Sequence, residues 1–492
     1  MLKRKHVAML LVLVLLFGFG ASNYAMSANA NSEVDSNHHV YSYIINELVS
    51  ARIPNASVAV IHDGELTFVL HDSDKNDLFQ IGSTGKAFTG LGILWLEDEG
   101  LISLDDPISK HLPWFTAYYD GRPVSDSLTI GSLLYMTSGI SSFGQNLYGM
   151  TLEEAMRQES GSELSFYPLT QMEYSNMNYN ILGHIMEVVS GKSYDAFMTE
   201  YIFIPLGLHN TFANPQKAYS SELVVRGYRW GFFGRWPSNL PAIIAEVPAG
   251  VIYSDINDMA RWMQIHLGVI EVSEQFERII RRSHEYIPES RIEIPPHVAH
   301  MFEYNPYYAA GWLRIPETGE IYHDGGTFSY TSRLFVRPQE GTAIVMLANV
   351  QTTDVSNISD NVLRLLAGEP VHPGVNNFFR TMDYVLSSII IAAVVGIIIL
   401  AWYVLRLRRK IKNGEMVRTG FSFKGGLRLI PAALLGILTM AILIFLPSVF
   451  FQSWAVLAWF FPLSLIPAVV LVATLSLTAL FVSFVRSVHK KV

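Results

Sequence analysis

The chain of 492 residues contains no cysteine. This absence excludes disulfide bridges, thiolate metal sites and a cysteine nucleophile, so the fold has to be stable without covalent cross-links. Charged residues are also scarce, at 16% against the roughly one quarter that is typical of soluble domains. Hydrophobic residues make up 50% of the chain, and the mean hydropathy is +0.27. Such a composition indicates that part of the chain lies in lipid.

The net charge of −8 combines two regions of opposite sign. Residues 31–380 contain 21 Lys and Arg against 41 Asp and Glu, whereas residues 381–492 contain 11 basic and 2 acidic residues. The acidic region disfavours nucleic acid as a partner, because binding to nucleic acid depends on the neutralisation of phosphates. The basic region is better explained by membrane topology.

The first 30 residues have the pattern of a secretory signal peptide. A basic start, Lys-Arg-Lys at positions 3–5, precedes an apolar run at 7–19, and Ala28-Asn29-Ala30 is an A-x-A-like cleavage site. We therefore expect residues 1–30 to be a signal peptide. An uncleaved N-terminal anchor is the alternative.

Three apolar runs near the other end, at 384–405, 430–451 and 454–485, are long enough to cross a bilayer as helices. Eight basic residues lie between the first two runs, and three more follow the third. The positive-inside rule then places these basic segments in the cytoplasm and residues 31–383 outside, as the signal peptide also requires. Because no ionisable residue interrupts the runs, an anchor is favoured over a transporter.

The outer region, residues 31–367, has strand patterns at both ends and helical patterns between them. An Asp-Gly turn within residues 62–65 is typical of a hairpin between strands at 57–61 and 66–70. Later strands are expected at 308–315, 330–336 and 342–348, and helices at 37–52, 83–99, 178–190, 255–267 and 355–366. This order predicts an α/β (α+β) domain with one sheet made from both ends of the chain and an inserted helical region. Residues 368–383, with Pro and Gly, form the predicted linker to the membrane segment, 384–492.

The first candidate for chemistry is Ser83-x-x-Lys86, at a junction between a loop and a helix. Residues three apart share a helix face, so the Ser83 hydroxyl and the Lys86 amine could meet. A serine hydroxyl becomes a good nucleophile only when a base takes its proton, and a desolvated lysine can do so. Alone the motif is not specific, since Ser487 to Lys490 has the same spacing. An N-cap serine is then the simpler interpretation.

Two further clusters of polar residues favour a catalytic role for Ser83 over that of an N-cap. Tyr174-Ser175-Asn176 begins a polar stretch that leads into a helix, and His323-Asp324-Gly325-Gly326 precedes a late strand. A pair of glycines beside a strand lets backbone N–H groups approach a ligand closely, as an oxyanion hole requires.

In order and spacing, Ser83-x-x-Lys86, Tyr174-x-Asn176 and His323-x-Gly325 resemble the three active-site motifs of serine hydrolases of the β-lactamase and penicillin-binding protein fold. The likeness is to the class C branch, which also includes DD-peptidases, D-aminopeptidases and esterases, and it covers about residues 37–367. Supporting stretches also match, at 128–139, 174–183 and 248–262.

The resemblance implies the following roles. Ser83 attacks a carbonyl and becomes acylated, while Lys86 and Tyr174 share the proton transfers, and either could be the base. Asn176 positions the substrate amide. The N–H groups of Ser83 and Gly326 form the oxyanion hole, with Gly325 beside it. The family needs no metal or cofactor.

Two positions depart from related enzymes. His323 stands where class C β-lactamases have a lysine, which weakens the expectation that a substrate carboxylate is bound. Asp324 could bias His323 toward its charged form or point away into solvent. The three C-terminal helices are similar to those of membrane peptidases that remove an N-acyl-D-asparagine cap. Those peptidases use an acidic residue where this chain has Gln80, a predicted pocket residue.

An aromatic cluster at 228–236 has two interpretations, as the roof of an acyl pocket or as packing. The sequence as a whole predicts a membrane-anchored, extracytoplasmic serine hydrolase of a small peptide or ester substrate, and it favours a peptide that contains a D-amino acid. A carboxylesterase or β-lactamase-type hydrolase is the first alternative. A penicillin-binding sensor without turnover is the second. The oligomeric state is not predicted.

Overall fold

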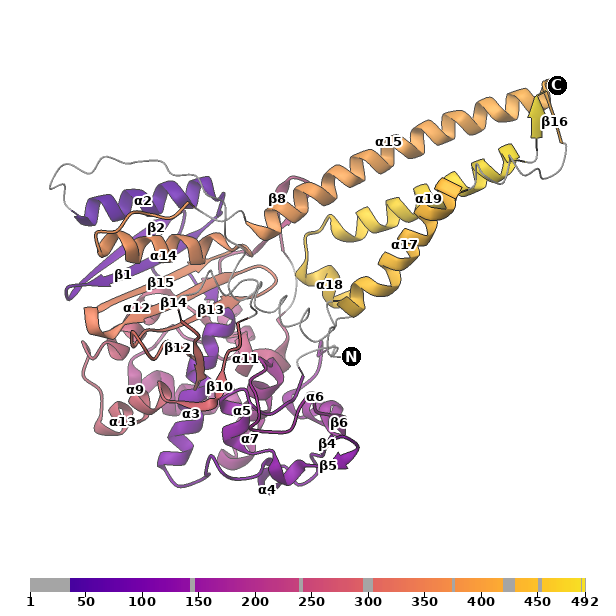
Figure 1. The fold of residues 1–492 in the computed structure, drawn as a ribbon. Helices are drawn as coiled ribbons and strands as arrows, with labels where there is room; N and C mark the ends of the chain where they lie inside the picture. The colour runs from indigo at the N-terminus through magenta and orange to yellow at the C-terminus, as the bar shows by residue number, and fades with distance from the viewer. Residues whose placement is uncertain are drawn as a thin grey trace. The chain divides into compact units, whose positions relative to one another are not determined.

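The computed structural model describes residues 36–141, 147–238, 242–294, 304–373, 377–418, 430–449, 454–487 and 489–491 (Figure 1). The predicted signal peptide, residues 1–30, lies outside them. The chain divides into two units. The first contains the residues up to Tyr228 and Pro237–Phe378, and the second contains Arg229–Trp236 and Phe379–Val492.

An eight-stranded antiparallel sheet forms the core of the first unit, in the order β10-β11-β12-β13-β14-β15-β1-β2. Its strands are β1 (Ala56–His62), β2 (Glu65–His71), β10 (Tyr286–Arg291), β11 (Tyr307–Ala309), β12 (Leu313–Arg314), β13 (Ile321–Gly326), β14 (Thr331–Arg337) and β15 (Thr342–Ala348). Because β1 pairs with β15, the predicted sheet made from both ends of the domain is confirmed, and so is the fold class.

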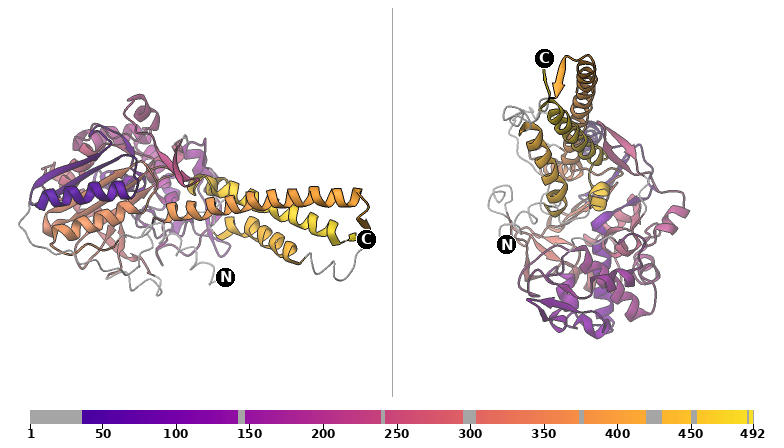
Figure 2. Two further views of the ribbon diagram at one scale, coloured as in Figure 1. Left: turned by 90° about the horizontal axis from the view of Figure 1, so that it is seen from above. Right: turned by 90° about the vertical axis from the view of Figure 1, so that its right-hand side faces the viewer.

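Helices cover both faces of this sheet. Figures 1 and 2 show α2 (Ser36–Ser50) and α14 (Asp354–Leu366) together on one face, and α12 (Ile256–His266) packs on the other. All seven residues of β15 are buried, which a strand covered on both faces requires.

The inserted region is helical, as expected, with small strand pairs. Its helices and turns are η1 (Gly82–Gly85), α3 (Lys86–Asp98), α4 (Ile108–His111), η2 (Ser125–Ser127), α5 (Ile130–Leu134), α6 (Leu152–Glu159), α7 (Asn176–Ser190), α8 (Tyr194–Met198), η3 (Thr199–Phe203), α9 (Ile204–Leu206), α10 (Pro215–Ser220), η4 (Ile244–Glu246), α11 (Val247–Gly250) and α13 (Glu274–Ser283), with η6 (Pro338–Glu340) later in the chain. The short strands are β3 (Phe79–Gln80) with β9 (Tyr253–Ser254), and β4 (Ala117–Tyr119) with β5 (Arg122–Pro123) and β6 (Ser162–Glu163).

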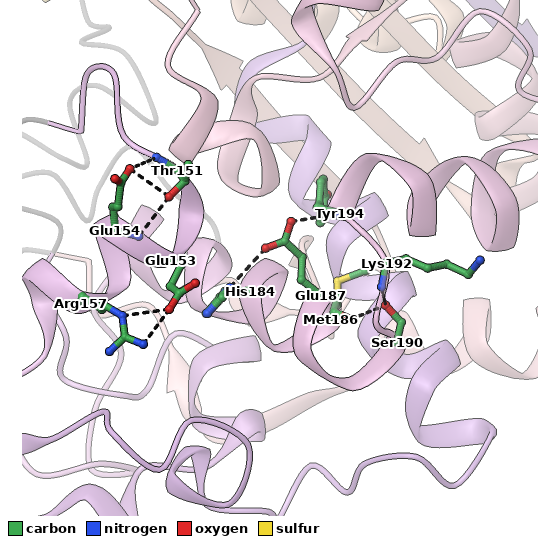
Figure 3. A network of polar contacts seen from close by, with 10 residues as sticks. All are labelled: Thr151, Glu153, Glu154, Arg157, His184, Met186, Glu187, Ser190, Lys192 and Tyr194. Atoms are coloured by element: carbon green, nitrogen blue, oxygen red, sulfur yellow. Dashed lines mark hydrogen bonds and ion pairs between the residues drawn. The ribbon is translucent and has the colours of Figure 1, made fainter.

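A polar network holds α7, the helix that begins at Asn176 (Figure 3). The Glu187 carboxylate accepts one hydrogen bond from the backbone N–H of Tyr194, at 3.0 Å, and its other oxygen lies 3.2 Å from His184 Nδ1. The Tyr194 hydroxyl then lies 2.6 Å from Thr89 Oγ1 on α3. These contacts connect α7 to α8 and α3, so they fix the relative positions of the two helices that carry Asn176 and Lys86.

Two predicted elements differ in detail. The predicted strand 308–315 is two short strands, β11 and β12, because Gly311 turns the chain with a φ of +83°. A Cβ at Gly311 would lie 2.4 Å from the Lys86 carbonyl carbon, so the turn brings backbone against the start of α3. The predicted helix 83–99 begins with the 3₁₀ turn η1 and continues as α3.

Apart from the end residues Tyr228, Pro237 and Phe378, the second unit contains the hairpin of β7 (Tyr228–Gly231) and β8 (Gly234–Pro237) and the helix α15 (Phe378–Lys412). Its other described elements are the helices α17 (Ile430–Val449), α18 (Trp454–Phe460) and α19 (Leu465–Ser487) and the strand pair β16 (Met416–Arg418) and β17 (His489–Lys491). By length and composition, two of the described helices could cross a membrane, α15 and the segment Leu465–Arg486. In α17 the apolar segment is shorter, Gly436–Pro447. Of the three predicted membrane spans, the structure thus supports two.

The third predicted run, 454–485, is not one helix. It is interrupted between α18 and α19, where Pro462 lacks the N–H that a continuing helix needs and disfavours helical geometry in the preceding residue. The Leu463 N–H instead donates to the Trp230 carbonyl of the hairpin at 2.8 Å. Trp230 is 2% exposed, which agrees with packing as the role of this aromatic residue.

Candidate active site

Ser83 and Lys86 meet at the start of α3. Ser83 lies in η1 and Lys86 is the first residue of the helix, and Lys86 Nζ lies 3.1 Å from Ser83 Oγ. The lysine is completely buried, whereas Ser83 is partly exposed. A serine that a substrate can reach is therefore hydrogen-bonded to an amine that solvent cannot reach.

The surroundings of Lys86 set its protonation. Its Nζ also donates to Asn176 Oδ1 at 2.8 Å and to the Ala249 carbonyl at 2.5 Å. Burial lowers the pKa of Lys86 to about 7, and the nearby charge of Glu246 acts in the opposite direction. An amine that titrates near neutrality can accept a proton from a serine hydroxyl and return it later.

Glu246, the last residue of η4, is a member of this cluster that the sequence analysis missed. Asn176 Nδ2 donates to Glu246 Oε2 at 3.3 Å, while Asn176 Oδ1 accepts from Lys86. The amide thus bridges an amine and a carboxyl group, which fixes its orientation. Burial raises the pKa of Glu246, and the charge of Lys86 and the Asn176 hydrogen bond lower it. One signal in the sequence was available for Glu246. It stands just before the stretch 248–262, which matches the family, and three residues before Ala249.

Tyr174, in the loop before α7, completes the group. Lys86 Nζ lies 4.9 Å from the centre of its ring. Ser83 interacts with the Tyr174 side chain and lowers the phenol pKa, but burial has the larger effect and raises it well above its usual value. The hydroxyl is buried and, among the described residues, forms no hydrogen bond of good geometry, so Ser83 is the polar group that acts on it. The raised pKa keeps the phenol protonated.

His323 lies on β13 near the same group and is neutral. It is completely buried, its Nδ1 lies 2.7 Å from the Asp324 carbonyl and its Nε2 lies 3.3 Å from the Tyr308 hydroxyl. Nδ1–H is thus the donor and Nε2 the acceptor. Burial and the charge of Lys86 lower the pKa of His323 to about 4. His323 therefore does not supply the permanent positive charge of a lysine.

The Asp324 carboxylate is directed at Arg333 and not into solvent, at 14% exposure of its side chain. Its charge still favours the protonated form of His323, but burial has the larger effect. Neighbouring residues of a strand face opposite sides of the sheet. Asp324 accepts two hydrogen bonds from Arg333, at 2.7 and 2.9 Å, and one from Ser356 at 2.8 Å. Its charge is thus paired with the buried Arg333 guanidinium.

The segments that carry the predicted oxyanion-hole donors are in contact. Gly82 has a φ of +58°, and a Cβ there would lie 2.7 Å from the Gly326 nitrogen. A Cβ at Gly325 would lie 2.2 Å from the Ile81 carbonyl oxygen. Glycine is required at these positions so that the turn before Ser83 can lie against the end of β13.

Gln80 is placed differently from the other predicted residues. It is 8% exposed in β3, and its Nε2 donates to the Tyr253 hydroxyl at 3.3 Å. Among the contacts of the described residues, none joins Gln80 to Ser83 or Lys86. The structure therefore brings four of the predicted residues together: Ser83, Lys86, Tyr174 and Asn176. His323, Gly325 and Gly326 lie beside them. Gln80 lies apart from this group, in the β3–β9 pair.

An accessible serine beside a buried lysine, on an α/β fold of this topology, defines the class of β-lactamase and penicillin-binding-protein-like proteins. A family model described as beta-lactamase matches residues 42–369. The chain belongs to this family, whose members are serine hydrolases.

Individual relatives are distant. Protein flp of Staphylococcus aureus (strain MW2) is 29% identical over 344 residues, which are 67% of this chain and 66% of that protein. The match thus spans just under two thirds of that relative. Penicillin-binding protein 4 of Amycolatopsis lactamdurans is 28% identical over 64% of this chain and 86% of its own length. The solved octameric penicillin-binding protein homologue from Pyrococcus abyssi has a TM-score of 0.56 at 23% identity, over 71% of this chain and 81% of its own, and supports the fold.

Proposed function

We propose that this protein is a membrane-anchored serine hydrolase that acts through an acyl-enzyme. Ser83 attacks the carbonyl carbon of an amide or ester, and its proton passes to Lys86. The proton is then delivered to the leaving group, with Tyr174 as the relay, and water hydrolyses the acyl-serine. The observation that carries this proposal is the completely buried Lys86 amine, 3.1 Å from the partly exposed Ser83 hydroxyl.

The substrate that this site favours has no carboxylate to be bound at the third motif. Burial and the nearby charge of Lys86 lower the pKa of His323 to about 4 and keep the ring neutral above that pH, so no charge is available there for a carboxylate. This supports a D-amino-acid-containing peptide or an ester over a β-lactam whose free carboxylate must be held. Hydrolysis rates on D-aminoacyl amides and on p-nitrophenyl esters distinguish peptidase from esterase.

The anchor is the second part of the proposal. The length and apolar composition of α15 and α19 support two spans, and the run at 430–451 supports a third. The basic residues that follow the first and third runs support a topology with the hydrolase domain on the extracytoplasmic side.

Covalent labelling tests the nucleophile. Full-length protein is treated with a fluorescent penicillin and with a fluorophosphonate, and Ser83→Ala is compared with Ser487→Ala, which alters the second S-x-x-K sequence. We expect Ser83→Ala to lose all labelling and Ser487→Ala to keep it. With a turned-over substrate, Ser83→Ala should lose up to about 10⁶-fold in rate. Labelling that survives in Ser83→Ala contradicts the assignment. Labelling of Ser83 without any turnover favours the sensor alternative.

A further inference from the structure

The β7–β8 hairpin carries an exposed aromatic surface within the second unit. We call Phe232, Phe233 and Trp236 the aromatic tip. Their exposed fractions are 44%, 42% and 51%. Exposed aromatic residues that cluster on one short element mark a surface that contacts an apolar partner.

The turn of this hairpin is strained. Phe232 and Phe233 have φ values of +52° and +64°. A two-residue turn with positive φ at both central positions is normally made by Asn-Gly, because a large side chain is disfavoured in that conformation. Such strain persists where the surrounding structure imposes it, and it is concentrated at functional positions.

The hairpin is held at the beginning of the apolar segment of α15. The Phe233 N–H donates to Asp383 Oδ2 at 2.9 Å, and the Phe233 ring lies 5.7 Å from that of Tyr384. Tyr384 is the first residue of the uncharged run 384–405, and Val385 after it is 56% exposed. The aromatic tip therefore lies where a membrane-spanning helix would pass from headgroups to hydrocarbon, the level at which aromatic residues are enriched.

The Asp383 carboxyl group beneath the tip has three hydrogen-bond donors from the protein. The buried Asp383 carboxylate accepts from the Phe233 N–H and from the hydroxyls of Ser387, at 3.1 Å, and Ser464, at 2.6 Å. Groups in the apolar part of a bilayer need internal partners of this kind.

Two backbone carbonyls face Arg229 on the other side of the hairpin. Arg229 Nη2 donates to the Ala458 and Phe461 carbonyls, at 2.5 and 2.6 Å, where α18 ends. The Trp236 indole N–H donates to the Gly231 carbonyl at 2.8 Å, so the ring can enter an apolar medium without an unpaired donor.

We propose that the aromatic tip is a lipid-binding surface, which inserts into the outer interfacial layer of the same bilayer that α15 and α19 span. Its rings lie among the headgroups and the first methylenes. The inference rests on the proposed membrane anchor.

Depth measurements on single cysteines test this proposal. Because the chain has no cysteine, one introduced thiol can be labelled with an environment-sensitive fluorophore without background. Full-length Phe232→Cys is reconstituted in phosphatidylcholine and phosphatidylglycerol vesicles and exposed to quenchers, a nitroxide lipid labelled near the headgroup or iodide in the water. Val188→Cys on α7, where Val188 is 48% exposed, is the aqueous control, and Val385→Cys is the lipid control.

We expect nitroxide quenching at position 232 to be several-fold stronger than at 188, and iodide quenching to be several-fold weaker. Trp236→Cys should give the same pattern and is an independent position. If 385 responds to the nitroxide while 232 and 236 respond only to iodide, the aromatic tip is not a lipid surface although the anchor stands. If 385 also fails to respond to the nitroxide, the anchor and this inference are both wrong.

Discussion

At the scale of single residues, the Lys86 amine combines complete burial with a nearby carboxyl charge that opposes the effect of burial on its pKa. Burial disfavours the ammonium form, and the negative charge of Glu246 favours it. The rings of Tyr174 and Tyr179 also face the amine, at 4.9 and 5.8 Å from Nζ to the ring centres, and the neutral His323 lies nearby. The opposition between burial and the Glu246 charge leaves the pKa of Lys86 at about 7.

Removal of the Glu246 charge should change the pH dependence of the reaction. In Glu246→Gln the burial of Lys86 is no longer opposed, so the pKa of Lys86 falls further. The limb of the kcat/KM profile that reports Lys86 therefore moves to lower pH, whichever protonation state the reaction uses. The pH profile of hydrolysis or of penicillin acylation is the measurement.

Glu153→Gln on α6 is the matched control, because Glu153 forms an exposed ion pair with Arg157 and its charge is screened. This control should leave the profile in place. A Glu246→Gln profile that coincides with the wild-type profile would show that Glu246 does not set the protonation of Lys86.

Sequence reasoning could identify the residues that motifs carry, and no others. The spacing of Ser83 and Lys86 predicts their contact, because three residues are about one helical turn. A histidine in place of a lysine is expected to be mostly neutral at pH 7. The participation of Glu246 could not be predicted, because it depends on the fold that brings η4 against Asn176 and Lys86. The partner of Asp324 could not be predicted either, because Arg333 lies on the neighbouring strand.

At the scale of elements, the close approach of η1 to β13 depends on glycine. We expect Gly325→Ala to destabilise the domain by about 1–3 kcal/mol, since its Cβ would lie 2.2 Å from the Ile81 carbonyl oxygen and 2.2 Å from Ser332 Oγ. Gly326→Ala is the adjacent control, because nothing lies within 4 Å of a Cβ there. Denaturant unfolding measures both variants, and equal stability of the two would contradict the packing argument.

A buried histidine pair connects α12 to the end of α13. His266 Nδ1 lies 2.7 Å from His284 Nε2, against the rings of Trp262 and Trp312. Burial lowers both pKa values, that of His284 to about 3, with Arg314 and the pair itself adding to the effect. Both histidines are therefore neutral in the folded state.

Stability should fall on acidification as a result. Below the ordinary histidine pKa the unfolded chain binds protons that the folded chain does not, so stability is complete above about pH 6.5 and decreases toward pH 3. Each such histidine contributes a slope of about 1.4 kcal/mol per pH unit. His284→Gln should have a shallower dependence between pH 6 and 4 in denaturant unfolding. An unchanged slope would show that this pair does not control the acid response.

The elements themselves were predictable where the pattern is local. The hairpin of β1 and β2 follows from Asp63-Gly64, both of which have positive φ. The division of strand 308–315 could not be predicted, because Gly311 is required there by the backbone of α3, which is far away in the sequence.

At the scale of the whole molecule, the proposed topology makes a prediction about the two sides of the membrane. Glu415 follows α15 among the basic residues and is exposed, and Val188 is exposed on the hydrolase domain. In intact cells we expect an impermeant maleimide to label Val188→Cys and not Glu415→Cys, with both labelled after permeabilisation. Labelling of Glu415→Cys in intact cells would reverse the proposed orientation.

The measurement that tests the central claim most directly is mass spectrometry of the trapped acyl-enzyme after exposure to cell-envelope extracts and, in parallel, to a penicillin. We predict one added acyl mass per chain, located by peptide mapping on Ser83 and absent from Ser83→Ala. An adduct on another residue, or none on a folded chain with either reagent, would contradict the account.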